Sequence, residues 1–178
     1  WDVVRSTIIS RLQSKCICYH RKFDVEPAES NERYLPKFGF PSSHLSAASH
    51  ARAGSHVLDI GSGPGHFASY LRRTRDCQVV GIDQYPPANP AAFDKFIKLD
   101  LDADEIPVPA GKVDVVFALD VIEHLANPEH FLRSLAQAFQ NRRNVQFIFS
   151  TPNIAFLLCR INLLFGRFNY GKRGILDL

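Results

Sequence analysis

The residues with the clearest chemical pattern run from Val57 to His66 and read Val-Leu-Asp-Ile-Gly-Ser-Gly-Pro-Gly-His. Glycines at alternate positions let a backbone bend sharply and approach a ligand without interference from Cβ atoms. The GxGxG spacing differs from the GxGxxG that positions a pyrophosphate, and Pro64 removes one backbone N–H donor. Asp59 opposes a diphosphate but attracts a cation, so the turn favours a positively charged nucleoside ligand.

Two acidic positions further along the chain complete a nucleoside pattern. Asp83 ends the sequence Gly-Ile-Asp, 18 positions after Gly65, where a carboxylate can accept hydrogen bonds from both hydroxyls of a ribose. Asp100 can accept from an adenine amino group, and Leu101 can pack against the ring. The alternatives are a loop acid that follows a strand at position 83 and a solvated acid within an acidic stretch at position 100.

Candidate acid–base groups lie in the segment from Ala118 to Leu125. Glu123 and His124 are the nearest candidates for a general base acting on a hydroxyl nucleophile. Together with Asp120 they form a D-x-x-E-H pattern, whose three ligands for Mg²⁺ can share one helical turn. The interpretation that we favour has no metal: Glu123 and His124 begin a helix and shape the floor of a pocket.

Alternating short strands and helices are predicted to position these groups. Apolar runs predict strands at 56–60, 78–82, 96–99, 113–119 and 145–149. Helices are predicted at 67–75, at 128–140 with Asn127 as N-cap, and from Ser42 or Ser43 to about Ala53. This alternation favours a parallel sheet covered on both faces, with the ligand beyond the carboxyl ends of the strands.

In this order, the four motifs resemble those of class I S-adenosylmethionine-dependent methyltransferases, over residues 55–153. The resemblance implies an α/β fold with a Rossmann-like, doubly wound, mostly parallel sheet. It implies S-adenosylmethionine as cofactor and S-adenosylhomocysteine as product. The implied cofactor-binding residues are Asp59, Gly61, Ser62, Gly63 and Gly65 around the methionine part and the sulfonium, Asp83 at the ribose with Gln84 beside it, Asp100 and Leu101 at the adenine, and Leu119 below the transferable methyl group.

Two narrower resemblances concern the metal and the acceptor. The D-x-x-E-H pattern is similar to the E-x-x-E-H metal site of small-RNA 2′-O-methyltransferases and of related quinone-biosynthesis methyltransferases, with Asp120 in place of the first Glu. The segments 150–153 and 163–177 are similar to a bacterial subgroup that occurs with glycosyltransferases and cell-surface polysaccharide genes. Members of that subgroup continue into a His-containing segment and two more strands, so we expect the C-terminal strands to be missing. The start at Trp1 and the absence of Met also predict a fragment.

Composition and charge limit the function classes. The chain has 178 residues, of which 46% are hydrophobic and 22% charged, as in a globular domain rather than a disordered tail or a coiled coil. Its net charge of +3 is too small to predict a nucleic-acid partner. Four cysteines without a CxxC pair and the lack of a signal peptide predict a reducing, cytoplasmic location.

The sequence predicts three parts: an N-terminal helical and irregular segment (1–54), a cofactor-binding core (55–153), and an apolar and basic segment (154–178). The last part is either a lid over an acceptor site or a helix packed on the sheet, and 154–170 is a candidate for contact with a membrane surface.

The predicted reaction is methyl transfer to a small-molecule, glycan or lipid-linked acceptor, at oxygen. The alternatives are a non-catalytic module that binds S-adenosylmethionine, and an NAD-dependent oxidoreductase, which Asp59 and the GxGxG spacing disfavour. The sequence leaves the oligomeric state open.

Overall fold

The computed structural model describes residues 42–107, 111–153 and 157–165. The chain divides into two units, one formed by Glu29–Thr151 and the other by Trp1–Ala28 with Pro152–Leu178. Residues 1–41 of the predicted N-terminal helical and irregular segment lie outside the described residues. In the part of the chain that the structure describes, no helix is long and apolar enough to cross a membrane.

The larger unit contains a five-stranded sheet in the order β3-β2-β1-β4-β5, in which every neighbouring pair is parallel. The strands are β1 (His56–Ile60), β2 (Gln78–Asp83), β3 (Lys95–Lys98), β4 (Val115–Leu119) and β5 (Gln146–Ser150). The central strand β1 places Asp59 opposite Gly81 of β2 and opposite Phe117 of β4. Because all strands run in the same direction, the residues that follow each one meet at a single edge of the sheet.

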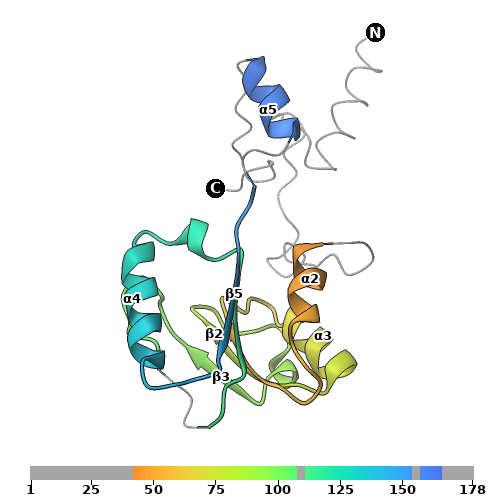
Figure 1. Ribbon diagram of the computed structural model, residues 1–178, viewed down its shortest axis with the longest axis vertical. Coiled ribbons are helices and arrows are strands. Elements are labelled where there is room, and N and C mark those ends of the chain that lie inside the picture. Colours follow the sequence, from red (N-terminus) through yellow and green to blue (C-terminus); the bar gives the residue numbers. More distant parts are fainter. Residues whose placement is uncertain (1–41, 108–110, 154–156, 166–178) are drawn as a thin grey trace. The chain divides into compact units, whose positions relative to one another are not determined.

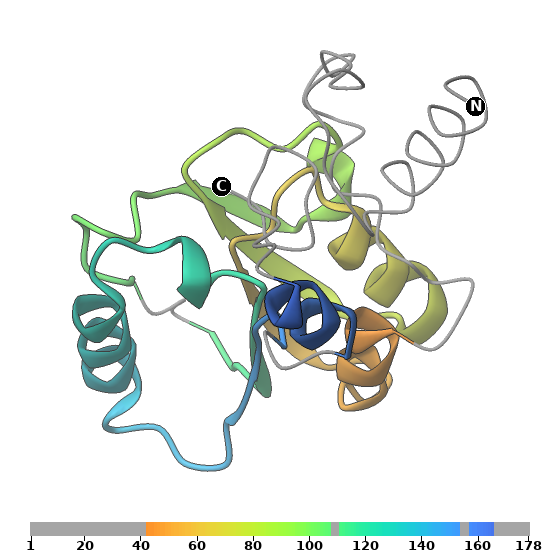
Figure 2. The ribbon, with the colours of Figure 1, turned by 90° about the horizontal axis from the view of Figure 1, so that it is seen from above.

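Helices cover both faces of this sheet. The helices α2 (Ser43–Ser49) and α3 (His66–Arg75) lie on one side of the sheet, and α4 (Pro128–Phe139) lies on the other (Figures 1 and 2). Two single-turn 3₁₀ helices, η3 (Pro90–Ala92) and η4 (Ile122–His124), follow β2 and β4. The predicted α/β architecture, a mostly parallel sheet with helices on both faces, is therefore confirmed. The smaller unit contributes α5 (Leu157–Leu164).

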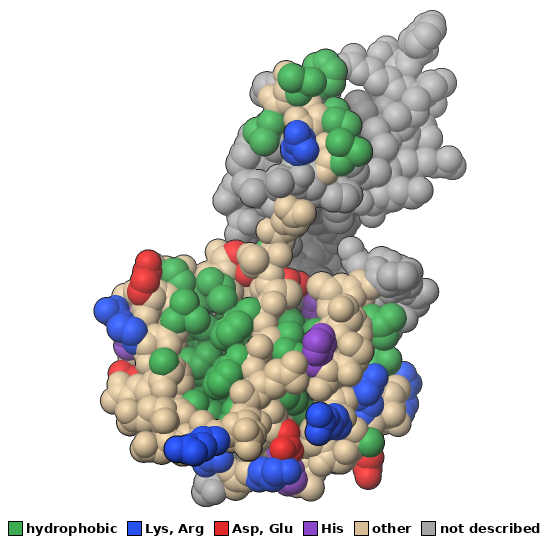
Figure 3. All heavy atoms as spheres, viewed as in Figure 1, with side chains coloured by type: hydrophobic (Ala, Val, Ile, Leu, Met, Phe, Trp, Pro, Cys, Tyr) green, Lys and Arg blue, Asp and Glu red, His purple; other side chains and the backbone are tan. Residues whose placement is uncertain are grey.

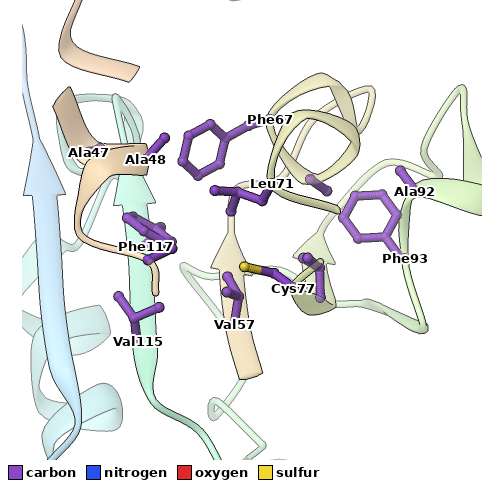
Figure 4. Close-up of a cluster of buried hydrophobic side chains, with 13 residues drawn as sticks. Ala47, Ala48, Val57, Phe67, Leu71, Cys77, Ala92, Phe93, Val115 and Phe117 are labelled. Carbon is purple, nitrogen blue, oxygen red and sulfur yellow. The ribbon is translucent and has the colours of Figure 1, made fainter. Parts of the chain in front are cut away.

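Successive side chains along each strand point to opposite faces of the sheet and so form two apolar cores, one on each face. Val57 of β1 points toward α2 and α3, whereas its neighbour Leu58 points toward α4. On the first side Phe67 of α3 meets Phe117 of β4 edge to face, with ring centroids 5.1 Å apart (Figure 4). Asp59 shares this first face with Val57, because side chains two residues apart on a strand point the same way. The sheet thus carries a carboxylate at the end of an otherwise apolar face.

The predicted element ends need one clear correction and several small ones. The first described helix ends at Ser49, so the prediction that it continues to about Ala53 is wrong. The N–H groups of His50 and Ala51 bond to carbonyls only three residues back, and the chain then turns at Gly54, whose φ is +70°. Of the two predicted N-caps, the structure has Ser42, whose side chain accepts from the N–H of Leu45 at 3.2 Å, and Ser43 is the first helical residue. The other elements begin and end within two residues of their predicted limits.

Asn127 holds the start of α4, as predicted, and its removal should be measurable. Its Oδ1 accepts from the N–H of His130 at 3.0 Å. We expect Asn127→Ala to lower the free energy of unfolding by about 1 kcal/mol, because a helix donor loses its partner. Urea unfolding measures this loss, and Asn127→Ser should retain most of the stability. Equal losses in the two variants would show that the cap does not contribute.

Candidate functional site

The glycine-rich turn after β1 is built from backbone that ordinary residues rarely adopt. Gly61, Gly63 and Gly65 have φ values of +68°, +51° and +91°. The N–H groups of Gly61 and Ser62 both donate to the carbonyl of Ile82, at 2.8 and 3.1 Å. The turn is therefore fixed to the end of β2, and its glycines leave a surface of bare backbone there.

An aromatic and an aliphatic side chain, those of Phe93 and Val121, pack directly against this turn. A Cβ atom at Gly61 would lie against the side chain of Val121, and one at Gly65 would lie 2.9 Å from a ring carbon of Phe93. The same ring would meet a Cβ at Gly81 at 2.5 Å. Phe93 is 8% exposed and follows the short turn η3. The glycines at 65 and 81 are therefore needed for packing as well as for access.

Asp83 joins the end of β2 to the glycine turn. Its Oδ2 accepts from the N–H of Gly63 at 2.8 Å, and its Oδ1 accepts from the N–H of Tyr85 at 2.9 Å. These two bonds fix the plane of a half-buried carboxylate, and each oxygen keeps a further lone pair for a ligand. Gln84, which follows it, is exposed. The structure thus brings together the first acidic motif and the glycine turn, as predicted from the sequence.

Asp59 is a carboxylate held where water cannot reach it. It is 3% exposed, and its Oδ2 has no hydrogen-bond partner among the described residues. Burial, and secondarily the negative charge of Asp83, raises the pKa of Asp59 to about 7. The hydroxyl of Ser62 is likewise buried without a partner in the described part of the chain. A cradle of bare glycine backbone with two unpaired oxygen atoms fits a ligand that carries a positive charge and hydrogen-bond donors.

The two residues that were predicted to bind an adenine ring, Asp100 and Leu101 near the end of β3, already have other contacts within the protein. Asp100 is exposed, but its Oδ1 accepts from the N–H of Asp102 at 3.0 Å and so stabilises its own turn. Leu101 is 9% exposed and belongs to the core on the α4 side of the sheet. Among the described residues, no side-chain hydrogen bond joins Asp100 to Asp83 or to the glycine turn. The predicted role of Asp100 and Leu101 at an adenine ring stays a prediction.

The end of β4 carries the candidate acid–base groups. Leu119 is half-buried, and Asp120 follows it in left-handed backbone, with φ of +54°. Asp120 is bonded to Ser150 at the end of β5: its N–H donates to the Ser150 hydroxyl at 3.0 Å, and its Oδ1 accepts from that hydroxyl at 2.6 Å. Ser150 is a residue to which the sequence assigned no role, and only the pairing of β4 with β5 reveals it.

Glu123 and His124 lie beyond this contact, in η4, and both are exposed. Partial desolvation, assisted by the negative charge of Asp120, raises the pKa of Glu123. Asp120 precedes η4, so the alternative that placed it on one helical turn with Glu123 and His124 is wrong. Within residues 42–107, 111–153 and 157–165, no three His, Cys, Asp or Glu side chains gather as metal ligands.

A parallel sheet with a glycine turn after β1 and an acid after β2 defines an α/β domain of the nucleoside-binding type. Residues 30–172 match the family model described as "Methyltransferase domain". This match covers well over half of the chain, which therefore belongs to the methyltransferase-domain family, whose cofactor is S-adenosylmethionine.

Individual relatives cover shorter regions. The chain is 34% identical over 98 residues to the 27-O-demethylrifamycin SV methyltransferase of Amycolatopsis mediterranei, which is 50% of this chain and 36% of that protein. It is 29% identical over 91 residues to the ajmaline N-methyltransferase of Rauvolfia serpentina, covering 46% and 31%. A SAM-dependent methyltransferase structure from Aquifex aeolicus superposes with a TM-score of 0.40 and 25% identity, over 53% of this chain and 55% of that one. The chain spans about a third of the length of the two curated relatives.

Proposed function

We propose that this domain binds S-adenosylmethionine at the carboxyl ends of β1 and β2 and transfers its methyl group to a hydroxyl of an acceptor. The observation that carries the proposal is the pairing of a buried carboxylate, Asp59, with a bare glycine turn that Asp83 holds in place. A buried unpaired carboxylate is costly unless a cation meets it, and a sulfonium nucleoside with an amino-acid tail supplies cations. A diphosphate nucleotide would instead bring negative charge toward the Asp59 carboxylate, and the two would repel each other.

In this proposal each residue positions the cofactor rather than activates it, because the sulfonium already supplies an activated methyl group for in-line displacement. Asp59, the glycine turn and Ser62 hold the methionine part, and Asp83 accepts from the ribose hydroxyls with Gln84 beside it. Asp100 and Leu101 remain the candidates for the adenine side. Leu119 forms the floor beside the reacting methyl group.

For the acceptor side we propose Glu123 and His124 as the groups that take the hydroxyl proton. The raised pKa of Glu123 brings its proton affinity closer to that of a useful base. Both side chains are exposed, and they follow Leu119 closely in the sequence. An oxygen target also agrees with the relative that acts on 27-O-demethylrifamycin SV, which matches at 34% identity against 29% for the N-methyltransferase. We place the acceptor among small molecules, glycans and lipid-linked intermediates of the glycosyltransferase-associated subgroup.

Calorimetric titration tests the cofactor site directly. We expect S-adenosylmethionine and S-adenosylhomocysteine to bind the 178-residue chain and NADH not to bind. Asp83→Ala should weaken both ligands by about 10- to 100-fold, because charged hydrogen bonds of about 1.5–3 kcal/mol are lost.

The matched control is Glu105→Ala, since Glu105 is an exposed acid of the same charge after β3. Thermal unfolding of both variants checks that the fold is retained. Unchanged affinity in Asp83→Ala, or tight NADH binding, would reject the proposed site. Tight cofactor binding without turnover on any hydroxyl acceptor would instead favour the non-catalytic module.

A further inference from the structure

The helix α5 exposes most of its described apolar side chains. Leu157, Ile161, Leu163, Leu164 and the following Phe165 are 64%, 41%, 47%, 81% and 72% exposed. The spacing of i, i+4, i+7 and i+8 places Leu157, Ile161, Leu164 and Phe165 on one face of a helix, whereas Leu163 lies on the far side of Arg160 from that face. In Figure 3 hydrophobic side chains of α5 lie on several sides of one basic side chain, and the helix holds a single basic residue, Arg160.

Positive charge gathers in the same unit as this helix. Residues 1–28 and 152–178 together hold nine Lys and Arg against four Asp and Glu, a formal charge of +5. Residues 29–151 hold twelve against fourteen, a formal charge of −2. The exposed apolar face therefore belongs to the basic part of a chain whose other part is acidic.

We propose that α5 binds flat on the surface of an anionic lipid bilayer, with its apolar face at the level of the acyl chains and Arg160 among the phosphates. A helix with apolar residues on one face and basic residues beside them lies in the interface plane and is attracted by anionic headgroups. An arginine can bury its aliphatic stem while its guanidinium reaches the headgroups. The short length of α5, from Leu157 to Leu164, suits a helix that lies on a bilayer and does not cross it.

The surface selects lipid over other occupants by its charge and shape. A protein partner with a groove would have to accommodate a convex helix that carries one guanidinium beside its apolar face. A bilayer interface instead offers acyl chains and phosphates side by side. This inference is independent of the proposed methyl transfer, because it uses none of the residues at the carboxyl ends of β1, β2 and β4.

Vesicle co-sedimentation of the full chain tests the proposal. We expect sedimentation with vesicles of equal parts phosphatidylcholine and phosphatidylglycerol, weakening as salt is raised, and little with phosphatidylcholine alone. Leu164→Glu should weaken partitioning by about tenfold or more, because a leucine leaves the acyl region and a repelling charge enters it. Arg160→Glu should weaken it by a similar factor on the anionic vesicles only.

The matched control is Leu132→Glu, which places the same charge on a 43% exposed leucine of α4. Circular dichroism confirms that each variant is folded. The proposal is overturned if the wild type stays in solution with anionic vesicles, if both vesicle types bind it equally, or if Leu164→Glu behaves like Leu132→Glu. It is also overturned if light scattering shows that Leu164→Glu dissociates a dimer while vesicle binding is absent.

Discussion

Alanine at position 81 is expected to lower the free energy of unfolding by about 1–3 kcal/mol and to weaken S-adenosylmethionine binding with it. The added Cβ would lie 2.5 and 2.7 Å from two ring carbons of Phe93 and 3.0 Å from the hydroxyl oxygen of Ser62. Phe93 is buried and Gly81 lies within β2, so neither backbone nor ring can move away cheaply. Urea unfolding and calorimetry measure the two effects.

The second-site variant Phe93→Leu separates this clash from a general effect of alanine. A smaller side chain at 93 should restore much of the stability to Gly81→Ala, although alone it costs stability by opening a cavity. Gly54→Ala is the matched glycine control, because φ is +70° there and its Cβ would meet nothing within 4 Å. It should cost only the left-handed strain of about 1–2 kcal/mol and leave cofactor affinity unchanged. If Phe93→Leu gives no recovery in Gly81→Ala, the ring is not the obstacle.

The parts of the site that follow a strand could be predicted from the sequence alone. Runs such as 56–60 and 115–119 are apolar enough to be buried on both faces, which marks central parallel strands. Once strands are known to be parallel, their carboxyl ends must meet, and Asp59, Gly63 and Asp83 come together without further information. The contact between Gly63 and Asp83 is the physical result of that rule.

Contacts made by residues that are remote in sequence could not be predicted in the same way. Hydrophobic patterning shows which face of a strand is buried, but not that Phe93 fills the space beneath Gly65 and Gly81. The hydrogen bonds between Asp120 and Ser150 likewise depend on strand order and on a left-handed residue. The prediction for the end of α2 was wrong because the chain turns toward β1 at Gly54. That turn, rather than helix propensity, decides where the helix ends.

Asp59 should make the protein less stable as pH rises, which is the reverse of the usual effect of a carboxylate. Its pKa is raised to about 7 in the folded chain, whereas an unfolded aspartate ionises near 3.9. Between these values the native state binds more protons, so stability falls with pH from about 4 and levels off above about 7. Asp59→Asn removes the ionisation, and its melting temperature relative to wild type should therefore rise between pH 5 and pH 8.

Asp94 provides a control of opposite sign beside the same sheet. Its Oδ2 accepts from the N–H of Val79 at 2.6 Å and pairs with Arg72 at 2.6 Å. Partial burial on its own would raise the pKa of Asp94, but these contacts outweigh that effect and lower the pKa. Its stabilisation is therefore complete above about pH 4 and is lost only as pH falls below that value. Asp94→Asn should lower the melting temperature by the same amount at pH 5 and pH 8, whereas the effect of Asp59→Asn should grow. If both variants show flat differences, Asp59 is ionised throughout, and burial does not control its proton.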